Sequence, residues 1–157
     1  MKRIANKQLW NYIGRFSVIH MITYSIIAMI FLFIQDVLPV SNRVALEFYK
    51  PYRPLNFMVL FSQGLRGVVL AFVLYPFYDC IVKGNRGGLI LFGALWGLVI
   101  LGSIEPLPGS IEGLIYTETT FVEHFMVLLA GGVQVMLFSW LFLRWEHSIR
   151  EEVDYYE

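Results

Sequence analysis

An uncharged apolar run over residues 16–35 is the feature that most limits the folds open to this chain. His20 is the only acidic or basic residue in it. A helix needs about 20 predominantly apolar residues to cross a bilayer, and this run supplies them. Because lipid offers no hydrogen-bond partner to the backbone, such a stretch crosses a membrane as an α-helix.

Three further apolar runs follow, and together the four predict an all-α, polytopic membrane protein. The spans are expected at about 12–35, 55–80, 87–105 and 119–144, within one integral membrane domain that covers residues 1–157. The composition agrees, because 57% of the residues are hydrophobic and 15% are charged, against about a quarter charged in soluble domains. We expect a four-helix up-down bundle with interfacial segments in its outer connectors.

Net charge and cysteine content exclude several classes of function. The 12 Lys and Arg residues balance 12 Asp and Glu residues, so nucleic acid is not an expected partner. Cys80 is the only cysteine, which rules out an intrachain disulfide and a multi-cysteine metal site. The expected partners are the lipid bilayer and, through glycine-rich helix faces, other membrane subunits or a second copy of the chain.

The first span carries a polar stripe. Ser17, His20 and Tyr24 recur at helical spacing, and Thr23 lies beside them. Lipid cannot hydrogen-bond to these side chains. We therefore expect the stripe to face the other helices.

The second span carries Arg66 near its middle, and this is the strongest functional signal in the chain. An arginine at that depth costs roughly 2.5–3.5 kcal/mol unless it faces protein, water or a carboxylate. Ser62 and Gln63 lie close to it along the helix, while Gly64 and Gly67 remove side-chain bulk so that another helix can approach. We expect Arg66 to point inward.

The third and fourth spans are expected to pack through small residues. Gly93 and Gly97 have the small-xxx-small spacing that lets two helix backbones approach each other. Their expected partners are Ala130, Gly131 and Gly132 in the last span.

Acidic residues and a histidine gather before and at the start of the last span. The long Arg66 side chain can reach outward to Glu123 or Glu105. Two interpretations stay open: an outward-facing pocket for an anion or headgroup, with Glu123 and His124 handling protons or cations, or an ion pair that only fixes helix packing. The candidate ligand-binding residues are Arg66, Gln63, Ser62, Glu123, His124, Glu105, His20 and Tyr24.

Two histidines in different spans raise the question of a haem b group with His20 and His124 as axial ligands. In an upright bundle their heights differ by roughly 8 Å, whereas a haem held by two histidines needs them level. We therefore expect no cofactor, no metal site and no catalytic residue.

Three segments resemble a known group of proteins. The tripeptide Leu65-Arg66-Gly67, the pair Arg86-Gly87 and the run from Pro108 to Thr117 are similar to those of small bacterial multi-span inner-membrane proteins with no known activity. The resemblance covers about residues 16–143. It implies a bacterial inner-membrane location and carries over no catalytic or binding residue.

The leading functional hypothesis is a non-enzymatic membrane protein that binds or passes a small polar, anionic or lipid ligand near Arg66. One alternative is an accessory subunit of a larger membrane complex. Another is a small membrane enzyme acting on lipid, with Glu123 or His124 as acid or base. The short loops favour the first two hypotheses over the enzyme.

Basic residues predict the orientation. They gather before the first span, between the second and third, and after the fourth, so the positive-inside rule places both termini in the cytoplasm. The acidic segment 146–157 is expected to be frayed or to face a partner.

This topology predicts the compartment of a fused reporter. A phosphatase that folds only outside the cytoplasm should be inactive when fused after Glu157, and a fluorescent protein that matures only inside should be bright. The opposite pair of signals would contradict the orientation.

Overall fold

The fold is a bundle of helices without strands in the part of the chain that the computed structural model describes, residues 2–37, 56–101 and 108–156. This confirms the all-α prediction. The four longest helices are α1 (Lys2–Val37), α2 (Phe57–Leu74), α3 (Gly87–Leu101) and α5 (Phe121–Tyr156), and α4 (Ile111–Tyr116) is a short helix before α5.

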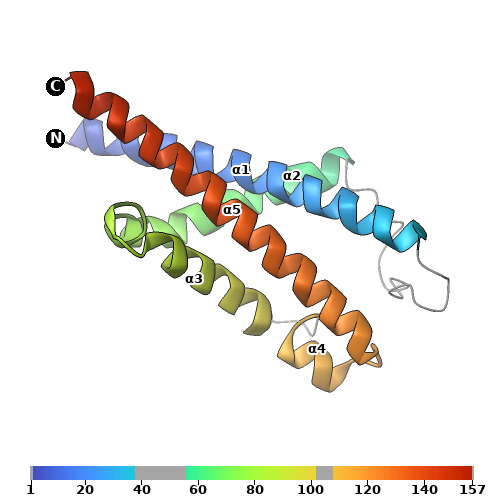
Figure 1. The fold of residues 1–157 in the computed structure, drawn as a ribbon. Coiled ribbons are helices and arrows are strands. Elements are labelled where there is room, and N and C mark those ends of the chain that lie inside the picture. The colour runs from blue at the N-terminus through green and yellow to red at the C-terminus, as the bar shows by residue number, and fades with distance from the viewer. Residues whose placement is uncertain (1, 38–55, 102–107, 157) are drawn as a thin grey trace.

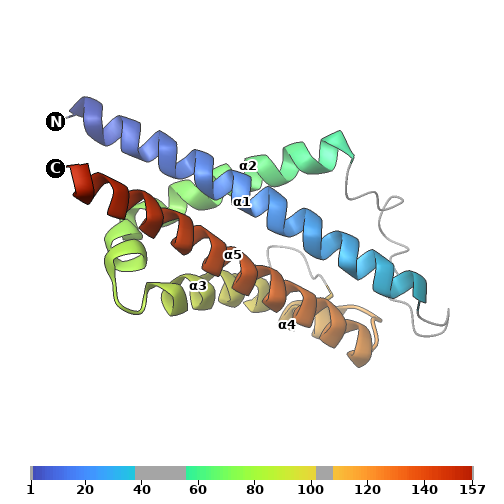
Figure 2. The same ribbon diagram turned by 45° about the horizontal axis from the view of Figure 1, so that its top comes forward.

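Successive long helices run in alternating directions (Figures 1 and 2). The start of α1 and the end of α5 therefore lie at the same end of the bundle, which we call the terminal end. The opposite, distal end carries α4 and the beginning of α5. The first outer connector and Glu105 lie outside the described residues, so the interfacial segment expected there is not described.

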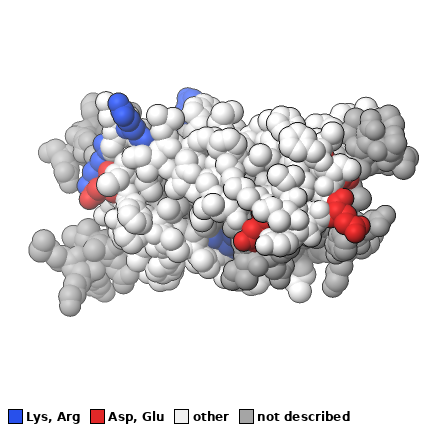
Figure 3. Space-filling view, turned by 90° about the horizontal axis from the view of Figure 1, so that it is seen from below, with Lys and Arg blue, Asp and Glu red and all other residues white. Residues whose placement is uncertain are grey.

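The long helices have the length and the surface of membrane helices. Three are long and apolar enough to cross a membrane, over Lys7–Val37, Phe57–Phe77 and Phe121–Ile149, and Gly87–Leu101 is a shorter apolar helix. Figure 3 shows a flank that is largely free of charged side chains between the two ends of the bundle. Exposed apolar surface of this extent is unusual for a protein in water and normal for one in lipid.

The helices pack in the order α2, α1, α5, α3. Close contacts join α1 to α2, α1 to α5 and α3 to α5, whereas α2 and α3 hardly touch along the described residues. The bundle thus has three closely packed seams, whereas α2 and α3 lie farther apart and contribute buried side chains such as Leu74 and Leu91 to one hydrophobic core.

Glycines let α2 approach α1, as the sequence predicts. A Cβ added to Gly67 would lie 2.8 Å from the Ser17 Cα, and one added to Gly64 would lie 3.0 Å from the Met21 Sδ. Ser17 and Thr23 of the polar stripe are buried, which confirms that the stripe of the first span faces the bundle.

The expected glycine contact between α3 and α5 is wrong in its details. An added Cβ would meet nothing within 4 Å at Gly93 or Gly97. The close contacts come instead from Gly131, whose added Cβ would lie 3.2 Å from Val99, and from the adjacent glycine of α5 beside Trp96. The seam therefore packs large side chains of α3 onto small residues of α5.

Pro76, which lacks a backbone N–H, lies in the 3₁₀ turn that follows the last residue of α2, Leu74. A 3₁₀ turn covers Tyr75–Phe77, and a π-helical turn covers Asp79–Lys83. The chain then reverses into α3 through a turn at Gly84, where an added Cβ would collide with the Cys80 carbonyl oxygen.

An aromatic core fills the terminal half of the bundle. Tyr12 and Phe16 of α1 lie edge to face with Phe142 of α5, at centroid distances of 5.5 and 5.1 Å. The helix α5 continues through Tyr156, and Glu146 is 1% exposed. The expectation of a frayed or partner-facing tail is therefore wrong for Glu146, which turns into this core.

The close contact at Gly67 predicts a large effect of a small substitution. Gly67→Ala forces a methyl group against the Ser17 backbone and should lower the free energy of unfolding by about 1–3 kcal/mol. Unfolding in a detergent-to-SDS titration, followed by circular dichroism, measures the change. The matched control is Gly93→Ala, where the methyl group meets open space, and an equal loss there would contradict the assignment.

Candidate functional site

A cavity of about 480 Å³ lies between α1, α2, α3 and α5 in the distal half of the bundle. The polar residues in its lining gather at its inner end, near mid-bundle: His20, Tyr24, Gln63, Arg66 and Gln134. Towards the distal end the lining is apolar, with Phe31 and Val127 among the residues there. We call this space the Arg66 cavity.

His20 is the best-defined polar group of the Arg66 cavity. It is 9% exposed, and its Nε2 atom has no hydrogen-bond partner among the described residues. Its ring packs edge to face on Phe138 at 5.9 Å and lies within interaction distance of the Gln63 amide and the Arg66 guanidinium. The Gln63 Oε1 atom is likewise buried without a described partner. A buried polar atom left unpaired costs about 1–3 kcal/mol, so this end of the cavity favours a polar occupant.

Arg66 supplies the positive charge of the cavity. Within the described ranges no carboxylate lies within the 4.0 Å of a salt bridge to its guanidinium. The expected ion pair with Glu123 is therefore absent, and Glu105 is not described. Arg66 contributes to the cavity lining, but it is exposed, so it lies at the edge of the cavity and is not buried as its depth in the span predicts.

Glu123 is occupied at the first turn of α5. One of its carboxylate oxygens accepts hydrogen bonds from the Thr120 backbone N–H and hydroxyl, both at 2.7 Å. This is the reciprocal capping box of a helix start, whose pattern, Thr followed three residues later by Glu, is readable in the sequence. Glu123 does not line the Arg66 cavity.

His124 ties the distal connector to α5. Its Nδ1 atom accepts a hydrogen bond of 2.8 Å from the Gly109 N–H, and its Nε2 atom lies 3.4 Å from the Thr117 hydroxyl. Gly109 has φ +89°, a conformation that favours glycine, and an added Cβ would lie 2.9 Å from Val127. His124 thus holds the Gly109 turn in place and does not line the cavity.

Of the predicted site residues, the structure brings His20, Tyr24, Gln63 and Arg66 to one cavity. Ser62 is exposed and donates to the Met58 carbonyl at 2.8 Å, away from the lining. Within the described ranges, no three His, Cys, Asp or Glu side chains lie together in a group that could hold a metal ion. The two histidines considered for haem lie apart, one in the cavity and one at the Gly109 turn.

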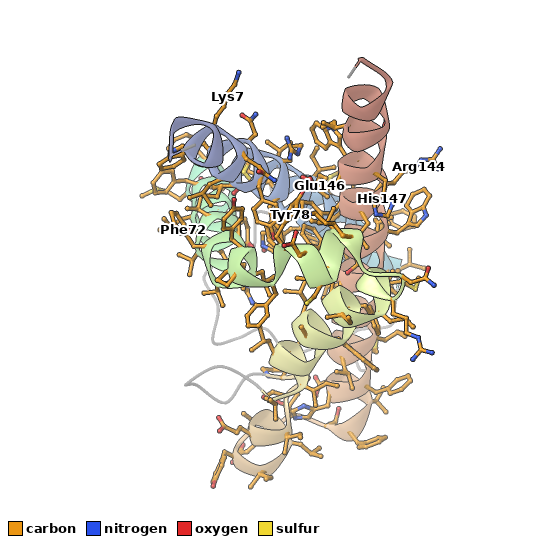
Figure 4. All side chains as sticks on the ribbon, turned by 90° about the vertical axis from the view of Figure 1, so that its left-hand side faces the viewer. Lys7, Phe72, Tyr78, Arg144, Glu146 and His147 are labelled. Atoms are coloured by element: carbon orange, nitrogen blue, oxygen red, sulfur yellow. The ribbon has the colours of Figure 1, made fainter. Side chains whose placement is uncertain are left out.

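A second polar cluster, which we did not predict, lies in the aromatic core at the terminal end. The Arg15 Nε atom donates to the Glu146 Oε1 atom at 2.6 Å, and the Tyr78 hydroxyl donates to the Oε2 atom at 3.1 Å (Figure 4). The signal for it is periodicity, because Phe138, Phe142 and Glu146 recur every four residues on one face of α5. Both carboxylate oxygens of Glu146 therefore have a donor, whereas the hydroxyl of Tyr12 in the same core is buried without a described partner.

No protein-family model, curated protein or solved structure matches this chain. Its class rests on its own geometry: a helical protein with three candidate membrane spans and a shorter apolar helix. The resemblance to small bacterial inner-membrane proteins stays a prediction.

The buried pair predicts an unequal response to two similar substitutions. Arg15→Gln leaves the Glu146 carboxylate buried without its cation and should lower the free energy of unfolding by about 3–5 kcal/mol. Lys83→Gln breaks the exposed pair with Asp79 and should cost about 0.3–0.5 kcal/mol. SDS titration of both variants makes the comparison, and equal effects would contradict the structural role of the buried pair.

Proposed function

We propose that this chain is a four-span membrane protein that binds a small anionic ligand with an apolar chain in the Arg66 cavity. The observation that carries the proposal is an exposed guanidinium with no described carboxylate partner at the edge of a cavity whose lining also includes the buried side chain of His20 and the half-buried side chain of Gln63. An anion there neutralises Arg66 and accepts hydrogen bonds.

The arrangement of the helices supports four crossings. In addition to the three candidate spans, the chain has the apolar helix α3. Its 15 residues measure about 22 Å and run alongside α5. Both chain ends lie at the terminal end, as an even number of crossings requires (Figure 1). With the basic residues inside, this end faces the cytoplasm of a bacterium and the Arg66 cavity opens in the outer half of the membrane.

Electrostatics favours an anionic occupant over a neutral or cationic one. A lone guanidinium in the hydrocarbon region is costly, and its cost falls when a carboxylate or phosphate meets it. Because Glu123 is held by Thr120, the described residues leave this role to a ligand. The acid and base of the enzyme hypothesis, Glu123 and His124, lie outside the cavity lining.

The dimensions and the apolar lining of the cavity limit the size and polarity of the rest of the ligand. Its volume of about 480 Å³ is within the range of ligand sites, about 300–1,000 Å³. It has room for roughly 16 groups of ~30 Å³ each. The apolar lining from Gln134 to Val127 extends for about 10 Å along α5, which suits a short acyl chain whose charged end lies deepest.

Binding of decanoate tests the proposal. The full chain in nanodiscs should bind radiolabelled decanoate saturably, and Arg66→Gln should weaken the binding about tenfold to hundredfold, because a charge-assisted hydrogen bond contributes about 1.5–3 kcal/mol. Arg66→Lys should restore part of the affinity. Decyltrimethylammonium, which has the same chain and the opposite charge, should not compete.

The matched control is Arg86→Gln, which removes an exposed cation from the turn before α3 and should leave decanoate affinity unchanged. Equal affinity of the wild type and Arg66→Gln, or competition by the cation, would refute an anion site. If Arg66→Gln fails to fold while Arg66→Lys folds without binding decanoate, Arg66 is structural and the proposal fails.

A further inference from the structure

A second concave surface lies between α3 and α5 at the terminal end, and it shares no lining residue with the Arg66 cavity. This groove has a volume of about 810 Å³. Its lining comes from the first turns of α3 and from one face of α5: Gly88, Leu89, Phe92, Met136, Ser139, Trp140, Leu143, Arg144, His147 and Ser148. We call it the α3–α5 groove.

Polarity along the α3–α5 groove changes in one direction. Arg144, His147 and Ser148 lie at the terminal end, whereas Phe92 and Met136 lie towards the middle of the bundle. Eight residues, about 12 Å, separate Met136 from Arg144 along α5. A charged end at the membrane surface and an apolar end at depth match the two ends of a phospholipid, and this order is the reverse of that in the Arg66 cavity.

Arg144 gives the outer end of the groove a positive charge. Among the side chains that the structure describes, its lining holds no carboxylate, because Glu146 turns to Arg15 on another face of α5. The Arg144 guanidinium lies 5.4 Å from the centre of the Trp140 ring, which holds the cation at the rim. The His147 ring is fixed by a contact of 2.9 Å between its Nε2 atom and the Val82 carbonyl oxygen.

The start of α3 adds backbone donors to this charge. The first helical hydrogen bond runs from the Ile90 N–H to the Arg86 carbonyl, so the N–H groups of Gly88 and Leu89 lie in the turn that lacks intrahelical acceptors. Gly88 has no side chain to keep an anion away from these groups. A helix N-terminus beside an arginine is a favourable place for a phosphate.

Ser139 is a buried polar residue in the lining of the same groove, and its Oγ atom, which has almost no accessible surface, would have to rotate to meet an occupant. It is 4% exposed, lines the groove, and its Oγ atom has no hydrogen-bond partner among the described residues. It lies five residues, about 7.5 Å, from Arg144 towards the centre of the bundle. That is the depth at which a phospholipid with its phosphate at Arg144 places its ester carbonyls, which accept hydrogen bonds.

We propose that the α3–α5 groove binds an acidic phospholipid, with its phosphate at Arg144 and the start of α3, an ester carbonyl at Ser139 and an acyl chain along Phe92 and Met136. Charge complementarity distinguishes this occupant from a helix of a partner, which would present no phosphate to the basic end. Basic pockets between helices at the cytoplasmic surface suit acidic headgroups. The proposal is independent of the Arg66 cavity.

Quenching of Trp140 by brominated lipid tests this inference. The full chain is reconstituted in phosphatidylcholine vesicles in which one fifth of the lipid is brominated phosphatidylglycerol, and in matched vesicles with brominated phosphatidylcholine. The signal of Trp140 is obtained by difference from Trp140→Phe. Stronger quenching by phosphatidylglycerol is expected, and Arg144→Gln should weaken this preference about fivefold, the effect of removing one basic residue near an anionic surface.

The matched control is Lys7→Gln, which removes an exposed cation at the same end of the bundle, on another side from Arg144 (Figure 4). The preference should survive this change. Gly88→Ala should also weaken the preference while the fold is kept, because its methyl group would lie 3.4 Å from a Leu143 methyl, an ordinary contact.

Three results would overturn the inference. One is equal quenching by the two brominated lipids in the wild type, and another is an equal loss of preference in Lys7→Gln and Arg144→Gln. The third is relief of the quenching by millimolar inorganic phosphate or glycerol phosphate, because a free anion would then be the occupant. If Arg144→Gln fails to fold, the response of Gly88→Ala decides between these outcomes.

Discussion

The absence of water inside a bilayer is the constraint on which this arrangement depends. Lipid chains neither donate nor accept hydrogen bonds, so a polar side chain on a membrane helix is stable only where protein or a bound molecule meets it. This explains why Ser17, His20 and Thr23 are buried on α1 while large apolar side chains such as Phe33 are exposed. In lipid this distribution lowers the free energy of the bundle, whereas in water it would raise it.

The two polar clusters meet this constraint in different ways. The carboxylate of Glu146 accepts from Arg15 and from Tyr78, so both of its oxygens have donors. His20 and Gln63 keep buried atoms without described partners, and the cation beside them has no described carboxylate. The first cluster is therefore complete within the fold, and it joins α1, α5 and the turn after α2. The second is open to a further molecule.

Much of the helical framework could be predicted from residue patterns. Apolar runs located the long helices, and the stripe through Ser17 and His20 showed which face of α1 is buried. The glycines of α2 pointed to a close approach because no side chain there keeps a neighbour away. The depth of Arg66 predicted a polar site beside it, since a charge in the middle of a span has few stable environments, but it did not predict that Arg66 itself is exposed.

The predictions that failed share a physical cause. Each depended on which helices pack against each other, and this packing is not a local property of the sequence. The burial of Glu146 depends on α5 continuing past its apolar run and on Arg15 lying opposite, and neither is a local property. The open faces of Gly93 and Gly97 depend on the rotation of α3 about its own axis, which the packing of Trp96 and Val99 on α5 determines. Glu123 could have been assigned from its capping pattern, because that signal is local.

The weak contact between α2 and α3 has a mechanical consequence. These helices are joined at the terminal end by the 3₁₀ and π-helical turns of residues 75–83, while each is braced along its length by a different neighbour, α1 or α5. The described bundle thus consists of two helix pairs, α1 with α2 and α3 with α5, which are connected by these turns at the terminal end. Because α1 also packs on α5, moving α2 away from α3 requires one helix pair to turn against the other at the seam between α1 and α5.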